Sequence, residues 1–154
     1  MRRKKQEIPK EECIRILTEE KRGVLSVIGD DGYPYGVPMN YYYDKEDGKI
    51  YMHCAKAGHK VDALGANDKV CFTVFNKGEK PDDDWAYFVT SVIAFGKAAF
   101  LTDMDVIRTK AKAFGMKYYP TEEEVDEEIR KDLSRANIIA ITIDHMTGKR
   151  VHEK

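Results

Sequence analysis

Short runs in which apolar and polar residues alternate dominate this chain. Between Lys69 and Phe75, for example, Val70, Phe72 and Val74 fall on one face of an extended segment. A two-residue period of this kind is typical of a β-strand with one buried face. The same pattern predicts strands over residues 24–28, 35–43, 49–53, 69–75, 85–101 and 138–143.

Turn signals separate these predicted strands. Asp-Asp-Gly at 30–32, Glu-Asp-Gly at 46–48 and Thr-Gly-Lys at 147–149 each predict a tight turn. Pro38 lacks a backbone N–H, so its strand is predicted to lie at a sheet edge or to contain a bulge. The middle of the longest strand, residues 91–96, is apolar on both faces and is therefore predicted to be buried on both.

Helices are predicted outside the strand region. One covers residues 9–20, with Pro9 in the first helical position, and another runs from Gly58 to about Gly65. Two more follow Thr102 and Thr121, which act as start signals. Short turns between strands and helices at the margins predict a single domain over 1–154: a mainly β fold with flanking helices, its antiparallel sheet closed into a barrel. The chain has no Gly-x-Gly-x-x-Gly segment after a strand, which argues against a Rossmann nucleotide site.

The composition of the chain argues against several classes of protein, including nucleic-acid-binding and membrane proteins. The 154 residues are 42% hydrophobic and 34% charged with a formal net charge of −1, as in an ordinary globular protein without general affinity for nucleic acid. No apolar run approaches the roughly 20 residues of a membrane span, and the basic residues 1–5 are predicted to be a solvated tail, so a cytoplasmic location is expected. Three separated cysteines and four histidines lack metal-ligand or disulfide spacing, so no metal site is predicted.

The strongest candidate for chemistry is the segment 51–60, where a predicted strand passes directly into a short helix. Gly58 lets the backbone approach a ligand, and His59 and Lys60 occupy the first helical turn. Free N–H groups, the helix dipole and an ammonium group together favour an anion, most naturally a phosphate. The alternative is an ordinary solvated lysine at a helix start.

An ordered set of short motifs resembles a known family. They are Tyr-Pro-Tyr-Gly-Val-Pro-Met-Asn-Tyr at 33–41, Ile-Tyr-Met-His-Cys-Ala at 50–55, Gly-His-Lys at 58–60, Ser-Val-Ile-Ala-Phe-Gly at 91–96 and Thr-Gly-Lys at 147–149. Each motif is weak, but together, across nearly the whole chain, they resemble the FMN-binding split β-barrel proteins. Within them the chain is similar to the pyridoxamine-phosphate-oxidase-related group that contains the Nim-type nitroimidazole-resistance reductases. The resemblance implies a split barrel and a homodimer with FMN at the interface, contacted by both subunits.

The resemblance also implies roles for particular residues. The flavin ring would be lined by backbone groups and the Asn40 side chain of a strand comprising Val37, Pro38, Met39, Asn40 and Tyr41. The ribityl and phosphate side would be lined by His53, Cys54 and Ala55, the phosphate by His59 and Lys60, and further contacts would come from Ser91 and Val92. Without the resemblance, the first segment reads as an edge strand with a bulge, His53 as an interior histidine and Ser91 as a locally hydrogen-bonded serine.

These roles lead to a function hypothesis with open alternatives. The first is an FMN-dependent oxidoreductase that reduces a small organic acceptor, for which a nitroaromatic is one candidate. The flavin would carry the chemistry, so no catalytic residue is assigned. Tyr41, His53, Trp85 and Phe88 are candidates to sandwich the acceptor, or else pack in the core or dimer. The tail lacks the arginine- and tryptophan-rich segment of true pyridoxamine-phosphate oxidases, which argues against vitamin B6 oxidation. The alternatives are a non-catalytic flavin- or haem-binding protein, a deazaflavin in place of FMN, and a barrel with no cofactor.

Overall fold

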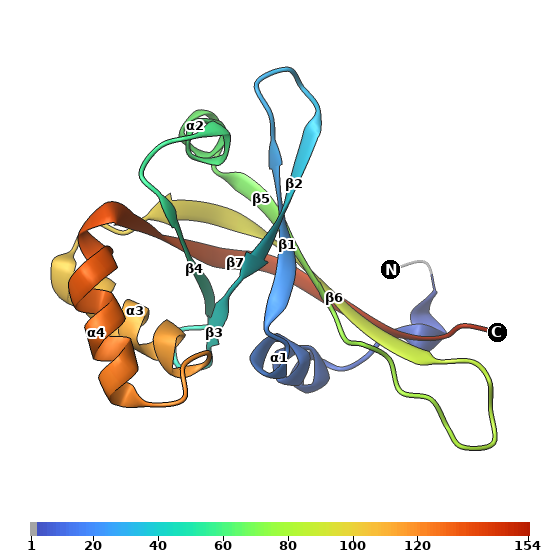
Figure 1. Ribbon diagram of the computed structural model, residues 1–154. Coiled ribbons are helices and arrows are strands. Elements are labelled where there is room, and N and C mark those ends of the chain that lie inside the picture. The colour runs from blue at the N-terminus through green and yellow to red at the C-terminus, as the bar shows by residue number, and fades with distance from the viewer. Residues whose placement is uncertain (1–2) are drawn as a thin grey trace.

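A computed structural model describes residues 3–154, in which one antiparallel sheet curls around a core and helices lie at its margins (Figure 1). The strands are β1 (Arg22–Ile28), β2 (Pro34–Asn40), β3 (Tyr42–Asp44), β4 (Lys49–Ala55), β5 (Lys69–Phe75), β6 (Phe88–Phe100) and β7 (Ala136–His152). The helices are α1 (Lys10–Glu19), α2 (His59–Ala66), α3 (Met104–Met116) and α4 (Glu122–Asp132), with short 3-10 turns at Lys4–Gln6 and Leu133–Arg135.

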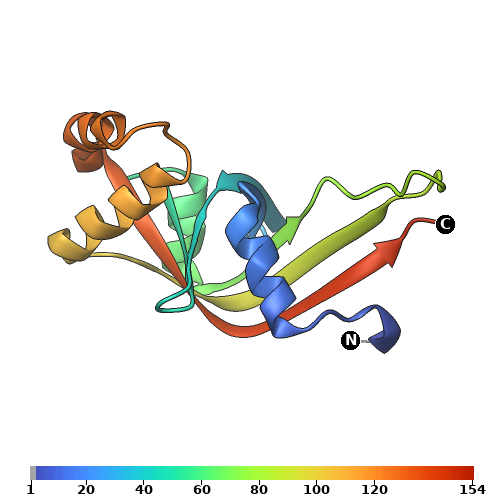
Figure 2. The same cartoon turned by 90° about the horizontal axis from the view of Figure 1, so that it is seen from below.

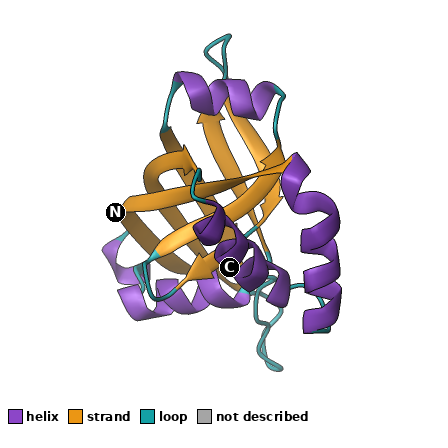
Figure 3. Ribbon diagram, turned by 90° about the vertical axis from the view of Figure 1, so that its left-hand side faces the viewer, coloured by secondary structure: helices purple, strands orange, loops and turns teal. Residues whose placement is uncertain are grey.

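The seven strands are ordered β2-β1-β5-β6-β7-β4-β3, and the curl of this sheet into a half-barrel is visible in Figure 3. The mainly β fold with flanking helices is therefore confirmed, as is the edge position of the strand that contains Pro38. None of the helices within residues 3–154 is long and apolar enough to cross a membrane. Residues 1 and 2 of the predicted basic tail lie outside the described range.

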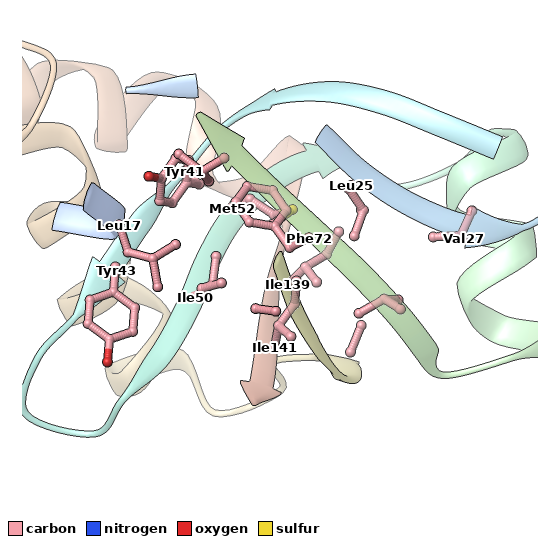
Figure 4. Packing of buried hydrophobic residues seen from close by; sticks show 14 of the residues in the cluster. Leu17, Leu25, Val27, Tyr41, Tyr43, Ile50, Met52, Phe72, Ile139 and Ile141 are labelled. Carbon is pink, nitrogen blue, oxygen red and sulfur yellow. The ribbon is translucent and has the colours of Figure 1, made fainter. Parts of the chain in front are cut away.

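The concave face of the sheet holds the main core. Alternate residues such as Leu25, Phe72 and Met52 are fully buried, and Leu17 from α1 closes the core from one side (Figure 4). Burial of this continuous apolar set is the principal term that stabilises the curled sheet.

The convex face is covered over only part of its area. The α3–α4 hairpin packs on the end formed by β4 and the start of β7, where Tyr51, Ile138 and Ala140 contact Ile107 and Ala111. The hairpin lies at one end of the molecule, and the C-terminus and the 76–87 loop lie at the other (Figure 2).

The rest of the convex face is uncovered in the single chain. One row across five paired strands comprises Thr147, Ile93, Thr73, Val24 and Pro38. We call this region the open face, which we define as Val24, Ser26, Pro38, Cys71, Thr73, Phe75, Ser91, Ile93, Phe95 and Thr147. The prediction that residues 91–96 are buried on both faces is wrong for the isolated chain, because Phe95 is 48% exposed.

The predicted turn at residues 147–149 is also wrong, because β7 continues through it to His152. Every one of these residues pairs with β6, whose register shifts once, between Phe95 and Gly96. Gly148 serves a close approach instead of a turn: a Cβ at this position would lie 2.5 Å from Sγ of Cys13 and 2.7 Å from Ile8. The glycine therefore lets the start of α1 lie directly against β7.

Four boundaries described here differ from the sequence prediction. The strand predicted over 35–43 breaks at Tyr41, between β2 and β3, and the strand predicted from residue 85 begins at Phe88. The cap of α3 is Asp103 instead of Thr102, because the Asp103 side chain accepts hydrogen bonds from the N–H groups of Asp105 and Val106. Pro9 precedes α1 as its N-cap residue.

Candidate functional site

The junction between β4 and α2 has the backbone geometry of an anion site. Gly58 precedes α2 with a φ of 122°, a conformation that side chains with a Cβ rarely adopt, and a Cβ there would meet nothing within 4 Å. The first N–H groups of a helix lack acceptors within it, and no side chain caps this one. The junction is therefore open and presents backbone donors.

Lys60 connects this junction to the edge strand β2. Its Nζ lies 3.2 Å from Sδ of Met39, and the side chain is half-buried. Burial lowers the pKa of His53, and the Lys60 charge lowers it further. Burial raises the pKa of Cys54, an effect that Lys60 opposes. Lys60 thus contacts Met39 of β2, and its charge acts on His53 and Cys54 of β4.

His59 points to a different neighbour. Its ring lies 4.6 Å from that of Tyr35 at an edge-on angle of 68°, and its Nε2 is 3.9 Å from Oδ1 of Asp30. His59 therefore packs on the β1–β2 hairpin, one residue from Lys60 but with separate contacts.

The strand β2 presents its predicted site residues in two directions. Val37 and Met39 are half-buried toward the core, whereas Pro38 and Asn40 are exposed on the convex side. Because β2 is the edge strand, the backbone groups on its outer margin have no neighbouring strand.

Tyr41 follows the last residue of β2 and is a core residue. Its ring is fully buried, lies 4.9 Å from Phe72 and has Nζ of Lys117 4.3 Å above it. The expectation that this ring sandwiches a substrate is therefore wrong. The backbone N–H of Tyr41 donates to the Tyr118 hydroxyl at 2.9 Å. The same hydroxyl oxygen lies 2.5 Å from the carbonyl oxygen of Lys21 and 2.7 Å from that of Tyr41.

Tyr118 and its neighbours at the end of α3 were not found from the sequence. Tyr118 stacks on Phe114, and Phe114 packs edge-on against His53 with 5.1 Å between ring centres. Lys117 donates to the Glu20 carbonyl at 2.6 Å, and burial lowers the pKa of Lys117 to about 8. The four-residue spacing of Phe114 and Tyr118 on a helix indicates a shared face, but not what that face contacts.

Ser91 and Val92 lie far from Lys60 within one chain. Ser91 of β6 pairs with Lys149 of β7. His53 of β4 pairs with Ile138 of β7, and the next residue, Ile139, pairs with Phe100 of β6. The nine steps from Ser91 to Phe100 along β6 correspond to about 30 Å at roughly 3.3 Å per residue. The Val92 side chain is buried in the core, and Ser91 is on the open face.

Trp85 and Phe88 belong to the same distant end as Ser91. Trp85 is 72% exposed in the 76–87 loop, and Phe88 stacks on His152 with 4.2 Å between ring centres. Asp84 fixes this loop to the C-terminal residues, because its carboxylate lies 2.7 Å from Nζ of Lys154 and accepts from the N–H of Ala86. The hydrogen bond from Lys154 lowers the pKa of Asp84 to about 2.

No three His, Cys, Asp or Glu side chains within residues 3–154 lie close enough to hold a metal ion, and the three cysteines are unpaired thiols.

Comparisons with known proteins agree with this fold. The sequence matches the family model described as pyridoxamine 5'-phosphate oxidase over residues 9–150. A candidate 5-nitroimidazole antibiotic resistance protein from Bacteroides thetaiotaomicron has a similar structure, with a TM-score of 0.78 and 23% identity over 95% of this chain and 87% of that one. No curated protein sequence matches at a significant level.

Two further similar structures are of cofactor-binding proteins. A FAD-binding protein from Mesorhizobium loti has a TM-score of 0.73 and 21% identity, with 95% of this chain and 97% of that one covered. A FAD- and haem-binding protein from Mycobacterium smegmatis has a TM-score of 0.75 and 19% identity, with 97% and 74% covered. At these identities the likeness establishes the split-barrel fold alone.

Proposed function

This chain belongs to the pyridoxamine 5'-phosphate oxidase family, and from that premise we propose that it is an FMN-dependent oxidoreductase that reduces a small organic acceptor as a homodimer. The observation that carries the proposal is the open, donor-rich junction at Gly58 with the Lys60 ammonium beside it.

The residues at this junction fit a phosphate monoester. Free N–H groups at the start of α2 and the positive end of its dipole favour a dianion, and Lys60 adds a full charge. The electrostatic influence of Lys60 on His53 and Cys54 supports a place for the ribityl chain along His53, Cys54 and Ala55. His59 would contribute from the side of the β1–β2 hairpin.

The edge strand fits one margin of a flavin ring. The backbone of Val37, Pro38 and Met39 and the side chain of Asn40 would offer hydrogen-bonding groups to its polar edge, because β2 has no strand on its outer side. Tyr41 would act indirectly, since its buried ring fixes the end of this strand.

A second copy of the chain would complete the site. The open face is a broad surface of apolar and small polar residues, and charged side chains such as Lys69, Lys97 and Lys149 lie only at its margin. Uncovered patches of this kind mark association surfaces. In the proposed dimer, a two-fold axis through the open face would carry Ser91 and Val92 of one subunit toward Lys60 of the other, so that both subunits contribute to the site. Trp85 and Phe88 of the same end would then be the substrate-side aromatic residues.

The cofactor and the protein would have different roles in the reaction. A bound flavin would supply the electron transfer, so no protein nucleophile is required. The chain itself would bind the phosphate, hold the ring against β2 and keep water from the ring through the second subunit. A nitroaromatic acceptor is favoured by the likeness to the Bacteroides protein.

A second candidate is a protein that binds flavin or haem without turnover. The likeness to the mycobacterial FAD- and haem-binding protein favours this reading. Absorption spectra of the purified full-length protein separate the two. The oxidoreductase predicts flavin bands that are bleached by a reduced nicotinamide donor and restored by a nitroaromatic acceptor. A Soret band, or flavin that no donor reduces, would contradict it, and a colourless protein that takes up no added FMN would contradict both.

Replacing Lys60 by alanine should weaken FMN binding by about 1.5–3 kcal/mol, or roughly ten- to a hundredfold in Kd, because a charge-assisted contact to phosphate is lost. A fluorescence titration of apoprotein with FMN measures the change. Lys45→Ala is the matched control, since Lys45 is an exposed lysine in the turn before β4. Equal FMN affinity in Lys60→Ala and wild type would remove Lys60 from the phosphate site.

A further inference from the structure

A small cavity lies between the α3–α4 hairpin and the convex face of the sheet. It is lined on the sheet side by His53, Ala136 and Ile138. The helical side comprises Ala111, Phe114, Gly115, Tyr119, Val125, Glu128, Ile129, Asp132 and Leu133.

The size of this cavity limits its occupant. Its volume is about 130 Å³. A cavity of about 150 Å³ with apolar walls accepts one benzene molecule. The space is open to solvent on one side, and its volume matches a single six-membered ring better than a whole tricyclic flavin.

The walls are largely apolar, and the two helices that form one side pack closely together. Gly115 and Val125 are buried where the helices touch, and a Cβ at Gly115 would lie 2.6 Å from Cγ1 of Val125. Lys112 links the helices through Glu122 and Asp126. Phe114 packs edge-on against His53, so the cavity presents an aromatic wall to a planar guest.

Two carboxylates, those of Glu128 and Asp132, are among the residues that line the cavity. Asp132 pairs with Arg135, and Lys131 pairs with Glu127 on the neighbouring position of α4. Glu128 is exposed and adjoins the Tyr119 hydroxyl, whose pKa is raised by burial and by Glu128. Within residues 3–154 no lysine or arginine forms an ion pair with Glu128. A carboxylate guest would therefore meet repulsion, whereas an ammonium group would meet an available partner.

We propose that this cavity binds one planar six-membered ring that is uncharged or carries a single positive group. The ring lies among Ala111, Phe114 and Ile138, and its cationic substituent points to Glu128. The site stands without the flavin proposal, although it shares His53 with the residues proposed to line FMN. A ring held here would therefore lie beside the cofactor if both proposals hold.

The test uses amide chemical-shift changes in the full-length, isotope-labelled protein near pH 7, with and without added FMN. The probes are benzylamine, benzyl alcohol and benzoate. We expect benzylamine to bind about fivefold more tightly than benzyl alcohol, the effect of one exposed charge pair, and benzoate to bind least. The shift changes should centre on the 111–138 segment and His53. Equal binding of benzoate and benzylamine, or changes elsewhere in the chain, would overturn the proposal. Because the measurement is made without FMN as well, failure of the flavin proposal leaves it unaffected.

Two pairs of variants separate shape from charge. Ala111→Leu fills the cavity with a good helix former and should abolish binding of benzylamine and benzyl alcohol, whereas Ala113→Leu on the same helix, outside the lining, should not. Glu128→Gln should reduce benzylamine affinity to that of benzyl alcohol, whereas Glu123→Gln, at an exposed position of α4 outside the lining, should leave the preference intact. Ring binding that survives Ala111→Leu in a folded variant, judged by circular dichroism, would place the site elsewhere, and an unchanged preference in Glu128→Gln would exclude Glu128 as the partner.

Discussion

Replacing Ile93 by lysine should convert the proposed dimer into a monomer and abolish FMN binding while the chain stays folded. Ile93 lies in the middle of the open face, paired with Thr73 on one side and Thr147 on the other, and its side chain points away from the core. An unpaired ammonium buried at an interface weakens association by roughly 3 kcal/mol or more, about a hundredfold in Kd. A two-fold interface would contain this substitution twice.

Light scattering at micromolar concentration reports the oligomeric state, and an FMN titration reports the site. Thr73→Arg, in the same cross-strand row, should behave like Ile93→Lys because it introduces a charge beside it. Met104→Lys is the matched control, since Met104 is an exposed apolar residue at the start of α3, outside the open face. A dimer that retains FMN in both Ile93→Lys and Thr73→Arg would show that the open face is not the interface.

Local sequence signals predicted most of the sheet because they act through neighbours along the chain. Alternation of Val70, Phe72 and Val74 specifies the buried face of β5, and the proline at position 38 predicts an edge position or a bulge, of which the structure shows the edge position. The sequence also predicts the strand-to-helix junction at Gly58, because the backbone conformation there depends on the glycine itself and not on distant segments.

Features that depend on distant segments were not predictable in this way. Gly148 resembles a turn residue in sequence, yet its function is to admit Cys13 and Ile8 against β7, which only the packing of α1 reveals. The sequence suggests that the Tyr41 ring faces a ligand, but in the structure Phe72 and Lys117 pack against this ring. The separation of Ser91 from Lys60 follows from strand order, which no single motif encodes.

Lys110→Met should lower the free energy of unfolding by about 1.5–3 kcal/mol, because the largely buried Asp44 carboxylate loses a charge-assisted hydrogen bond. Nζ of Lys110 lies 2.6 Å from Oδ2 of Asp44 and 2.8 Å from Oδ2 of Asp47, and it lies 4.8 Å from the centre of the Tyr51 ring. The side chain of Asp44 is only 9% exposed, so it would be left buried without its cation. Methionine keeps the apolar stem, which isolates the loss of charge.

The pH dependence of stability gives a second signature of this ion pair. Burial alone would raise the pKa of Asp47, but hydrogen bonds from Lys110, Tyr51 and the backbone N–H of Lys49 lower it. A carboxyl whose pKa is lower in the folded state contributes stability above its ordinary pKa of 3.8, and this contribution is lost as the pH falls through the lower folded value. The difference between wild type and Lys110→Met should therefore be full at neutral pH and shrink below about pH 4.

Urea unfolding at a series of pH values measures both effects, and Lys112→Met provides the comparison. Lys112 lies on the same helix and also contacts two carboxylates, but its side chain is 40% exposed and those of Glu122 and Asp126 are 60% and 50% exposed. Exposed pairs of this kind contribute about 0–1 kcal/mol, so Lys112→Met should change stability by that amount or less. Lys110 links α3 to β3 and to the turn before β4. Its loss should therefore also loosen the packing of Phe114 in α3 against His53 in β4. Equal destabilisation by the two substitutions would show that the burial of Asp44 does not make the contacts of Lys110 stronger than the exposed ion pairs of Lys112.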